Sequence, residues 1–227
     1  MKQFIIVMTL LIGLQSCKND SADEMKVLIE IFDDLIDTMG VLSEFLIPPP
    51  PSIPFFDYNN NVMVYDAVEH QKVIDEIEIK NKKMRDTTFV IAVFDTLFTC
   101  YDKNLNVSHI QSQLTEKGYI EALKATENQL IISRPLDLSK IKNRERFTLK
   151  YLSEFPEGMK IWERENYDFL FSGVLAISRI YFDPTGQFGI FDCSYTCGRL
   201  CGEGVIICIR KINDKWIIEK TILLSVS

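Results

Sequence analysis

The C-terminal part of the chain constrains the fold most, because strand-forming segments alternate there with turn-forming residues. Four segments rich in β-branched and aromatic residues follow one another, at 174–182, 187–196, 205–212 and 215–226. Asp-Pro-Thr-Gly, the glycine-containing CGRLCGEG and Asn-Asp separate them. Because short connections of this kind join neighbouring antiparallel strands, the sequence predicts an antiparallel β-meander over residues 174–226.

Helices are predicted in the N-terminal half. In residues 24–47, apolar side chains recur at spacings of three and four and acidic residues lie mostly between them, which is typical of an amphipathic helix. Residues 65–84 predict a second helix, and the β-branched and aromatic run at 87–99 predicts a strand. Helices that precede a sheet indicate an α+β fold, with N-terminal helices followed by a C-terminal antiparallel meander.

A proline-rich stretch, PPPPSIP at 48–54, stands between the first helix and the rest of the chain. Consecutive prolines cannot continue a helix and favour a stiff extended conformation. We therefore predict a spacer at 48–54 and a globular α+β domain over 55–227. Two interpretations of the preceding helix stay open: it packs on its own domain, or residues 24–46 dock onto a protein partner.

Residues 1–16 have the layout of a secretory signal peptide. Lys2 supplies the basic start, an uncharged apolar run extends from Phe4 to Leu14, and a small residue precedes the cysteine that follows. The apolar run is too short to cross a bilayer as an ordinary helix. We therefore expect export, with the polar residues 17–23 acting as a tether.

The segment LQSC at 14–17 resembles the lipobox of bacterial lipoproteins. In that family the signal peptide is cut before the cysteine, whose sulfur then carries a lipid, and acyl chains such as palmitate anchor the protein. The resemblance implies that Cys17 is lipidated and that the protein is held on a membrane of the cell envelope, outside the cytoplasm. In that family an aspartate directly after the cysteine indicates retention in the inner membrane of enteric bacteria. For a Gram-negative host the resemblance therefore favours the outer membrane, because Lys18 stands at this position, and CKND is similar to lipoproteins of Bacteroidetes.

The tail carries a second resemblance. SRIYFDPTGQFGIF and CGRLCGEGVIICIRKINDKWIIEK are similar to the C-terminal part of uncharacterised bacterial secreted and lipoprotein domains, over residues 170–227. The terminal tryptophan-containing hairpin also resembles that of NTF2-like α+β folds. These resemblances imply a scaffold and no particular chemistry.

The composition limits the function classes. The chain of 227 residues has a net charge of −7 and no long basic run, so nucleic acid is not an expected partner. It contains neither Gly-x-Ser-x-Gly, nor His-Glu-x-x-His, nor a phosphate-binding P-loop. Asp95, in an otherwise apolar strand, and His109 are the candidates for an acid–base pair, against the alternative that Asp95 is a structural carboxylate. No cofactor is expected.

Four of the six cysteines lie in CSYTCGRLCGEGVIIC, at Cys193, Cys197, Cys201 and Cys208. Export would permit disulfides between them. Cys197 and Cys201 bracket Gly-Arg-Leu at a predicted hairpin tip, and they are the favoured pair. A bond between them would close a small loop across the tip.

The outer two cysteines are the second candidate pair. If Tyr195 faces Ile206 across the hairpin, Cys193 faces Cys208, as a strained disulfide or as two small core residues. The even spacing with no histidine nearby does not match the paired ligands of a zinc site, so no metal is expected.

Together these features predict a lipid-anchored extracytoplasmic protein that acts as a binding or interaction module and is not an enzyme. The first alternative is a small-molecule-binding or hydrolytic domain on an NTF2-like scaffold. The second alternative is a thiol-redox or metal protein that uses the cluster from Cys193 to Cys208.

Overall fold

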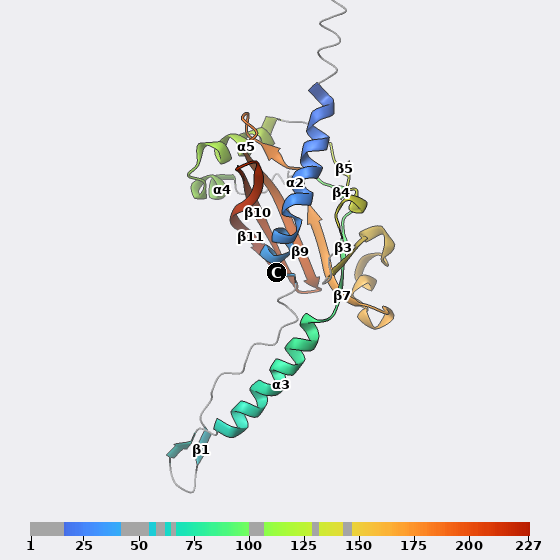
Figure 1. The fold of residues 1–227 in the computed structure, drawn as a ribbon, viewed down its shortest axis with the longest axis vertical. Helices are drawn as coiled ribbons and strands as arrows, with labels where there is room; N and C mark the ends of the chain where they lie inside the picture. Colours follow the sequence, from blue (N-terminus) through green and yellow to red (C-terminus); the bar gives the residue numbers. More distant parts are fainter. Residues whose placement is uncertain are drawn as a thin grey trace, which may run out of the picture.

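A computed structural model describes residues 16–41, 55–57, 62–64, 67–99, 107–128, 132–142 and 147–227 (Figure 1). The predicted spacer at 48–54 lies outside these residues, and so does all but the last residue of the predicted signal peptide. The described part has an α+β fold, as predicted. Its α-helices are α2 (Ser16–Thr38), α3 (Ala67–Arg85), α4 (Val107–Gln113) and α5 (Lys117–Asn128).

Most strands join one seven-stranded sheet, in the order β11-β10-β9-β7-β3-β6, with β8 paired to β9. They are β3 (Phe89–Val93), β6 (Phe147–Tyr151), β7 (Leu170–Ile177), β8 (Tyr181–Phe182), β9 (Phe188–Gly198), β10 (Cys201–Ile212) and β11 (Lys215–Val226). Two short pairs lie apart from it: β1 (Phe55–Asp57) with β2 (Val62–Val64), and β4 (Thr96–Leu97) with β5 (Arg134–Pro135).

The predicted meander is present, because β7, β9, β10 and β11 pair antiparallel in this order. The sequence did not predict β6, or that β3 runs parallel to both β6 and β7. Parallel neighbours require long crossover connections, here α4 and α5 before β6, and the 3₁₀-helices η3 (Leu152–Glu154), η4 (Gly158–Trp162) and η5 (Arg164–Asn166) before β7.

Helix α2 is displaced from the predicted bounds of 24–47. It begins at Ser16, so residues 17–23, which the sequence predicted as a polar tether, are helical. It ends at Thr38, and residues 42–47 lie outside the described part of the chain.

The end of α2 is set by Gly40, which has a φ of 62°. The Gly40 amide donates to the carbonyl of Asp37 at 3.1 Å, and the Val41 amide donates to the carbonyl of Ile36 at 3.4 Å. This pair of bonds is the Schellman motif, in which glycine adopts the left-handed conformation just after a helix. Val41 and Ile36 are both buried, which adds the hydrophobic contact that accompanies the motif.

The apolar side of α2 is buried against the sheet. Eight of its side chains and those of the following turn are at most 2% exposed: Val27, Leu28, Ile31, Phe32, Leu35, Ile36, Met39 and Val41. They form one core with the odd-numbered residues of β9 and β10, including Phe191 and Ile207. The helix therefore packs on its own domain, and its buried apolar face is not available to a partner. It shares one core with the sheet, whereas the predicted globular domain of 55–227 excluded it.

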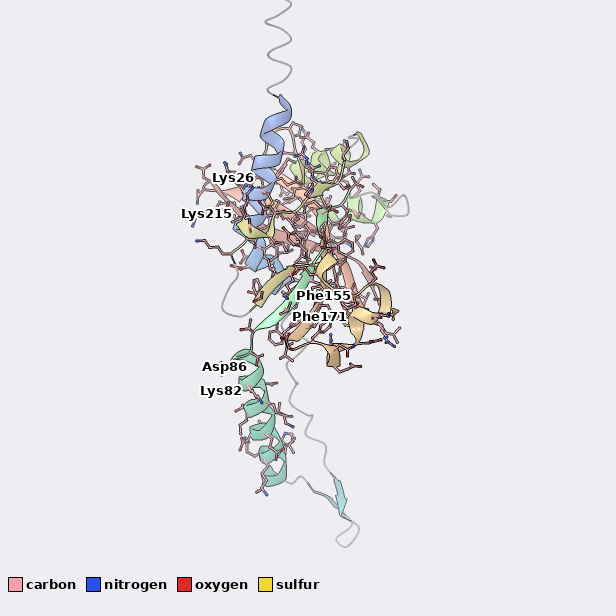
Figure 2. All side chains as sticks on the ribbon, turned by 90° about the vertical axis from the view of Figure 1, so that its right-hand side faces the viewer. Lys26, Lys82, Asp86, Phe155, Phe171 and Lys215 are labelled. Carbon is pink, nitrogen blue, oxygen red and sulfur yellow. A yellow bond between two sulfur atoms is a disulfide. The ribbon has the colours of Figure 1, made fainter. Side chains whose placement is uncertain are left out.

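The opposite face of the sheet carries two separate clusters. Helices α4 and α5 cover β8, β9 and β10, where the even-numbered residues Ile190, Ile206 and Cys208 are buried. An aromatic cluster covers β3 and β7 and contains Phe155, Trp162, Tyr167, Phe169 and Phe171. Figure 2 shows Phe155 and Phe171 close together in the half of the body nearer to α3.

Helix α3 corresponds to the predicted helix at 65–84, and it projects from the body at the end opposite to the start of α2 (Figures 1 and 2). Lys82 and Asp86 mark where it joins the body in Figure 2. On its predicted apolar side, Val68 is 71% exposed, whereas Ile74 and Ile77 are half-buried. Its contribution to the core is therefore smaller than that of α2.

Asp183 shapes the predicted turn at 183–186. Its carboxylate accepts hydrogen bonds from the amides of Thr185, Gln187 and Phe188 at 2.9–3.1 Å, and from the Thr185 hydroxyl at 2.5 Å. Burial opposes the charge on this carboxylate, but the hydrogen bonds hold the pKa of Asp183 below its ordinary value. The ionised form is thus the one that stabilises the turn.

Replacing Asp183 with asparagine should lower the free energy of unfolding at neutral pH by about 1–3 kcal/mol, because the charged acceptor is lost. The pKa of Asp183 is lower in the folded than in the unfolded protein, so its stabilisation is complete above the unfolded pKa and is lost as the pH falls through the folded pKa. The difference between the two proteins should therefore shrink below about pH 4. Urea unfolding at neutral and acidic pH measures it; a pH-independent difference would contradict this account.

Candidate functional site

A cleft opens where the C-terminal end of α2 meets the tip of the β9–β10 hairpin and the end of β11. Its volume is about 430 Å³, within the range of small-molecule sites. The lining residues are Thr38, Met39, Gly40, Tyr195, Cys197, Cys201, Gly202, Glu203, Val226 and Ser227. Since they come from three segments far apart in the chain, no local sequence motif marks the cleft.

A disulfide forms one wall of the cleft. It joins Cys197 to Cys201, the pair that the sequence favoured, and the two Cα atoms are 5.2 Å apart. Cys201 pairs with Gly198, so Arg199 and Leu200 form a two-residue turn, and a bulge follows directly after Cys201. The bond links the two strands beside the turn and holds the wall in place.

Tyr195 connects this wall to the end of α2. Its hydroxyl lies 2.6 Å from Oγ of Ser172, which donates to the carbonyl of Val41 at 3.2 Å. The Arg164 guanidinium makes a second connection between β7 and the hairpin, because it donates to the carbonyls of Ser172 and Cys197, at 3.1 Å and 2.6 Å. The hairpin tip, β7 and the helix end are therefore fixed to one another, so the shape of the cleft is built into the fold.

Glu203 supplies the charge in the cleft. It pairs with Tyr195 across the hairpin, so both side chains lie on the face of the sheet that α2 covers. The C-terminal end of a helix also carries partial negative charge, here at Thr38 and Met39. Among the side chains of the described residues that line the cleft there is one carboxylate, that of Glu203, and no lysine, arginine or histidine. The electrostatics favour a ligand that presents a positive or hydrogen-bond-donating group.

The register of the hairpin overturns the predicted pairing of Cys193 with Cys208. Cys193 pairs with Val205, and Cys208 pairs with Ile190. Cys193 belongs to the core against α2, whereas Cys208 belongs to the cluster under α5 on the opposite face. The register assumed from the sequence differs from the observed one by an odd number of residues. A shift of this kind places a side chain on the opposite face of the sheet.

These two thiols are buried and remain in the un-ionised form, which is not nucleophilic. Burial raises the pKa of Cys193 well above its ordinary value and that of Cys208 to about 12, so both stay protonated at neutral pH. Within the part of the chain that the structure describes, no three histidine, cysteine or acidic side chains are placed to hold a metal ion. The four cysteines of the stretch thus form one disulfide and two separate core residues.

Asp95 and His109 are not brought together. The Asp95 carboxylate accepts hydrogen bonds from the amide and the hydroxyl of Ser153, at 3.0 Å and 2.5 Å, and so caps η3. His109 is exposed on α4, where its Nε2 lies 3.0 Å from Nε2 of Gln113. Neither residue lines the cleft. Asp95 is therefore a structural carboxylate, which was the alternative to a role in an acid–base pair.

One carboxylate outside the cleft has an unusual pKa. Burial raises the pKa of Asp192 to about 6. Asp192 follows Phe191, which faces α2, so its side chain lies on the opposite face of β9. It is therefore separated from the cleft by the sheet.

Removing the disulfide should loosen the cleft wall without unfolding the protein. For the double replacement of Cys197 and Cys201 by serine, we expect a loss of about 2 kcal/mol in the free energy of unfolding, because the closed loop is short. Urea unfolding measures the loss, and hydrogen exchange at Gly198 and Gly202 should report local opening. The matched control is Cys193→Ser, which should be destabilising with no selective opening at the tip.

Cys17, the proposed lipidation site, lies in the first turn of α2. Of the helices in the described ranges, none has the length and apolarity needed to cross a membrane. Comparison with protein-family models, with curated proteins and with solved structures finds no match to this chain.

Proposed function

We propose that this protein is a lipid-anchored extracytoplasmic binding protein that holds a small ligand in the cleft between α2 and the β9–β10 hairpin. The observation that carries the proposal is the cleft itself, which is walled by the disulfide between Cys197 and Cys201 and fixed to the end of α2 through Tyr195. A rigid, preformed cavity favours binding because little ordering remains to be done when the ligand enters.

Two features support the extracytoplasmic location. The segment LQSC resembles a lipobox and implies export and lipidation at Cys17. A disulfide at an exposed hairpin tip persists in an oxidising compartment and is rare in the cytosol. The two features lie far apart in the chain and point to the same side of the membrane.

The chemistry of the lining supports binding over hydrolysis. The side chains include the hydrophobic Met39 and Val226, the Tyr195 ring and the disulfide, with Glu203 and Thr38 as polar contacts. This set fits a small molecule with an apolar body and an ammonium group. The two residues that the sequence offered as an acid–base pair, Asp95 and His109, serve elsewhere and do not line the cleft.

Lipidation is tested by mass spectrometry of the protein extracted from the membrane of a bacterial host. We expect a mature chain that begins at Cys17 and carries acyl chains, and a Cys17→Ala protein that is recovered without lipid. An unmodified full-length chain in the membrane fraction would refute the lipoprotein part of the proposal.

Binding is tested with three probes of equal length and different charge: n-butylammonium, n-butanol and butyrate. In ¹H–¹⁵N spectra, the ammonium probe should shift the amide signals of Gly202 and Glu203 most, because it places a cation beside the carboxylate. Glu203→Gln should abolish that preference, whereas Asp214→Asn, at a side chain that is 97% exposed in the β10–β11 turn, should preserve it. Equal shifts with all three probes would contradict a cation-binding cleft.

A further inference from the structure

We infer that α2 is a rigid stalk that holds the domain upright on the membrane, with the ligand-binding cleft at the end away from the lipid. The inference rests on the proposed lipid attachment at Cys17. It adds the direction in which the cleft faces, and hence the kind of ligand that reaches it: a soluble molecule of the surrounding medium and not a bilayer lipid.

The connection between the lipid and the domain is short and helical. Helix α2 is continuous from Ser16 to Thr38, and Glu24 is already 2% exposed in the protein interior. At a rise of about 1.5 Å per residue, the seven steps from Cys17 to Glu24 span about 10 Å. A random coil of the same length would let the domain rotate freely relative to Cys17. A continuous helix fixes the position of Cys17 relative to the domain.

From Glu24 onward the stalk is joined to the body, so this part of the helix cannot swivel against the domain. Where the stalk enters the body, the Glu24 carboxylate accepts from Nε of Arg179 at 2.8 Å and from the Ile180 amide at 2.6 Å. Further along, Glu30 accepts from the Trp216 amide at 3.1 Å. At its end, Val41 accepts from Ser172. Tilting the helix against the domain would break these contacts and expose its buried apolar side.

The same contacts define the two ends of the molecule. Glu24, where α2 enters the body, lies beside Ile180 and near the turn at 183–186, and Arg179 there also donates to the carbonyl of Ile132 at 2.8 Å. The end of α2 lies beside the disulfide tip. Figures 1 and 2 place α3 at this second end, pointing away from the start of α2.

The distances set the height of the cleft. From Cys17 to Thr38, a straight helix spans about 30 Å at about 1.5 Å per residue. The turn at 183–186 is therefore near the bilayer, while the cleft and the exposed Leu200 at the hairpin tip are far from it. A ligand that enters the cleft arrives from the medium.

The orientation is tested with the lipidated protein in vesicles of phosphatidylethanolamine and phosphatidylglycerol that carry a short-range acceptor dye on their headgroups. A fluorescent amino acid is introduced by codon reassignment at Pro184 or at Leu200, which is 91% exposed, so that the cysteines stay unchanged. We expect several-fold stronger quenching at Pro184 than at Leu200.

The control inserts Gly-Ser-Gly-Ser between Asp23 and Glu24, which breaks the helical stalk and should bring the two quenching values together. The lipid is measured by mass in each sample, so the two proposals fail separately. Absence of lipid would refute the lipoprotein part of the proposed function. A lipidated, uninserted protein with equal quenching at both positions, or stronger quenching at Leu200, would overturn the stalk.

Discussion

Replacing Glu24 with alanine should lower the free energy of unfolding by about 3–5 kcal/mol, because it leaves the guanidinium of Arg179 buried without its partner. Glu24 and Arg179 are 2% and 7% exposed. The Glu24 carboxylate also accepts from the Ile180 amide at 2.6 Å, so the replacement removes an acceptor for the backbone as well. Urea unfolding, followed by the fluorescence of Trp216 beside α2, measures the loss.

The matched control for this replacement is an exposed ion pair. Lys117 and Glu121 lie on α5 with side chains that are 89% and 33% exposed, and Glu121→Ala should cost less than about 1 kcal/mol. A double replacement of Glu24 and Arg179 by methionine should recover part of the loss, because no charge is then left unpaired. Equal effects of Glu24→Ala and Glu121→Ala would show that the buried pair does not fasten α2.

Replacing Phe171 with alanine should have an effect of similar size, about 3–5 kcal/mol. Its ring centroid lies 5.1 Å from that of Phe155, 5.5 Å from Tyr167 and 5.7 Å from Trp162, so the replacement opens a cavity in the aromatic cluster. The emission of Trp162 should shift even before global unfolding, since one of its packing partners is gone. Chemical denaturation measures the stability, and native-state emission reports the local change.

Two variants bracket this result. Phe171→Leu keeps much of the buried volume and should cost clearly less than the alanine replacement. Leu200→Ala removes a side chain that is 91% exposed and should leave the stability unchanged. If Phe171→Leu and Phe171→Ala were equally destabilising, the cost would not come from the cavity.

The elements that the sequence predicted well are those whose signals are local. The strands from 174 to 226 alternate with turn residues, and the turn at 183–186 forms around Asp183 as that pattern indicates. The Cys197–Cys201 bond closes a loop of neighbouring residues, so its spacing, together with the expected export, made it the favoured pair. The bounds of α2 were missed although Gly40 was available as a C-cap signal.

The elements that the sequence missed depend on partners far away in the chain. Nothing near Cys193 indicates its register against β10, because a single bulge at the tip shifts every pair beyond it. The ion pair between Glu24 and Arg179 joins residues far apart in the chain, so no local pattern indicates it. The parallel neighbours of β3 follow from crossover connections, which carry no periodic signal of their own.

By itself, the sequence determined the α+β class, the C-terminal meander, the disulfide candidate and the expectation of a lipid on Cys17. Propensity, turn chemistry and short spacings act over a few residues, so these features can be recognised without a partner. Only the tertiary structure decided that α2 is part of the core, that Cys193 and Cys208 lie on opposite faces, and that a cleft forms between Thr38 and Glu203. Burial and register are properties of segments brought together by folding, and no single segment encodes them.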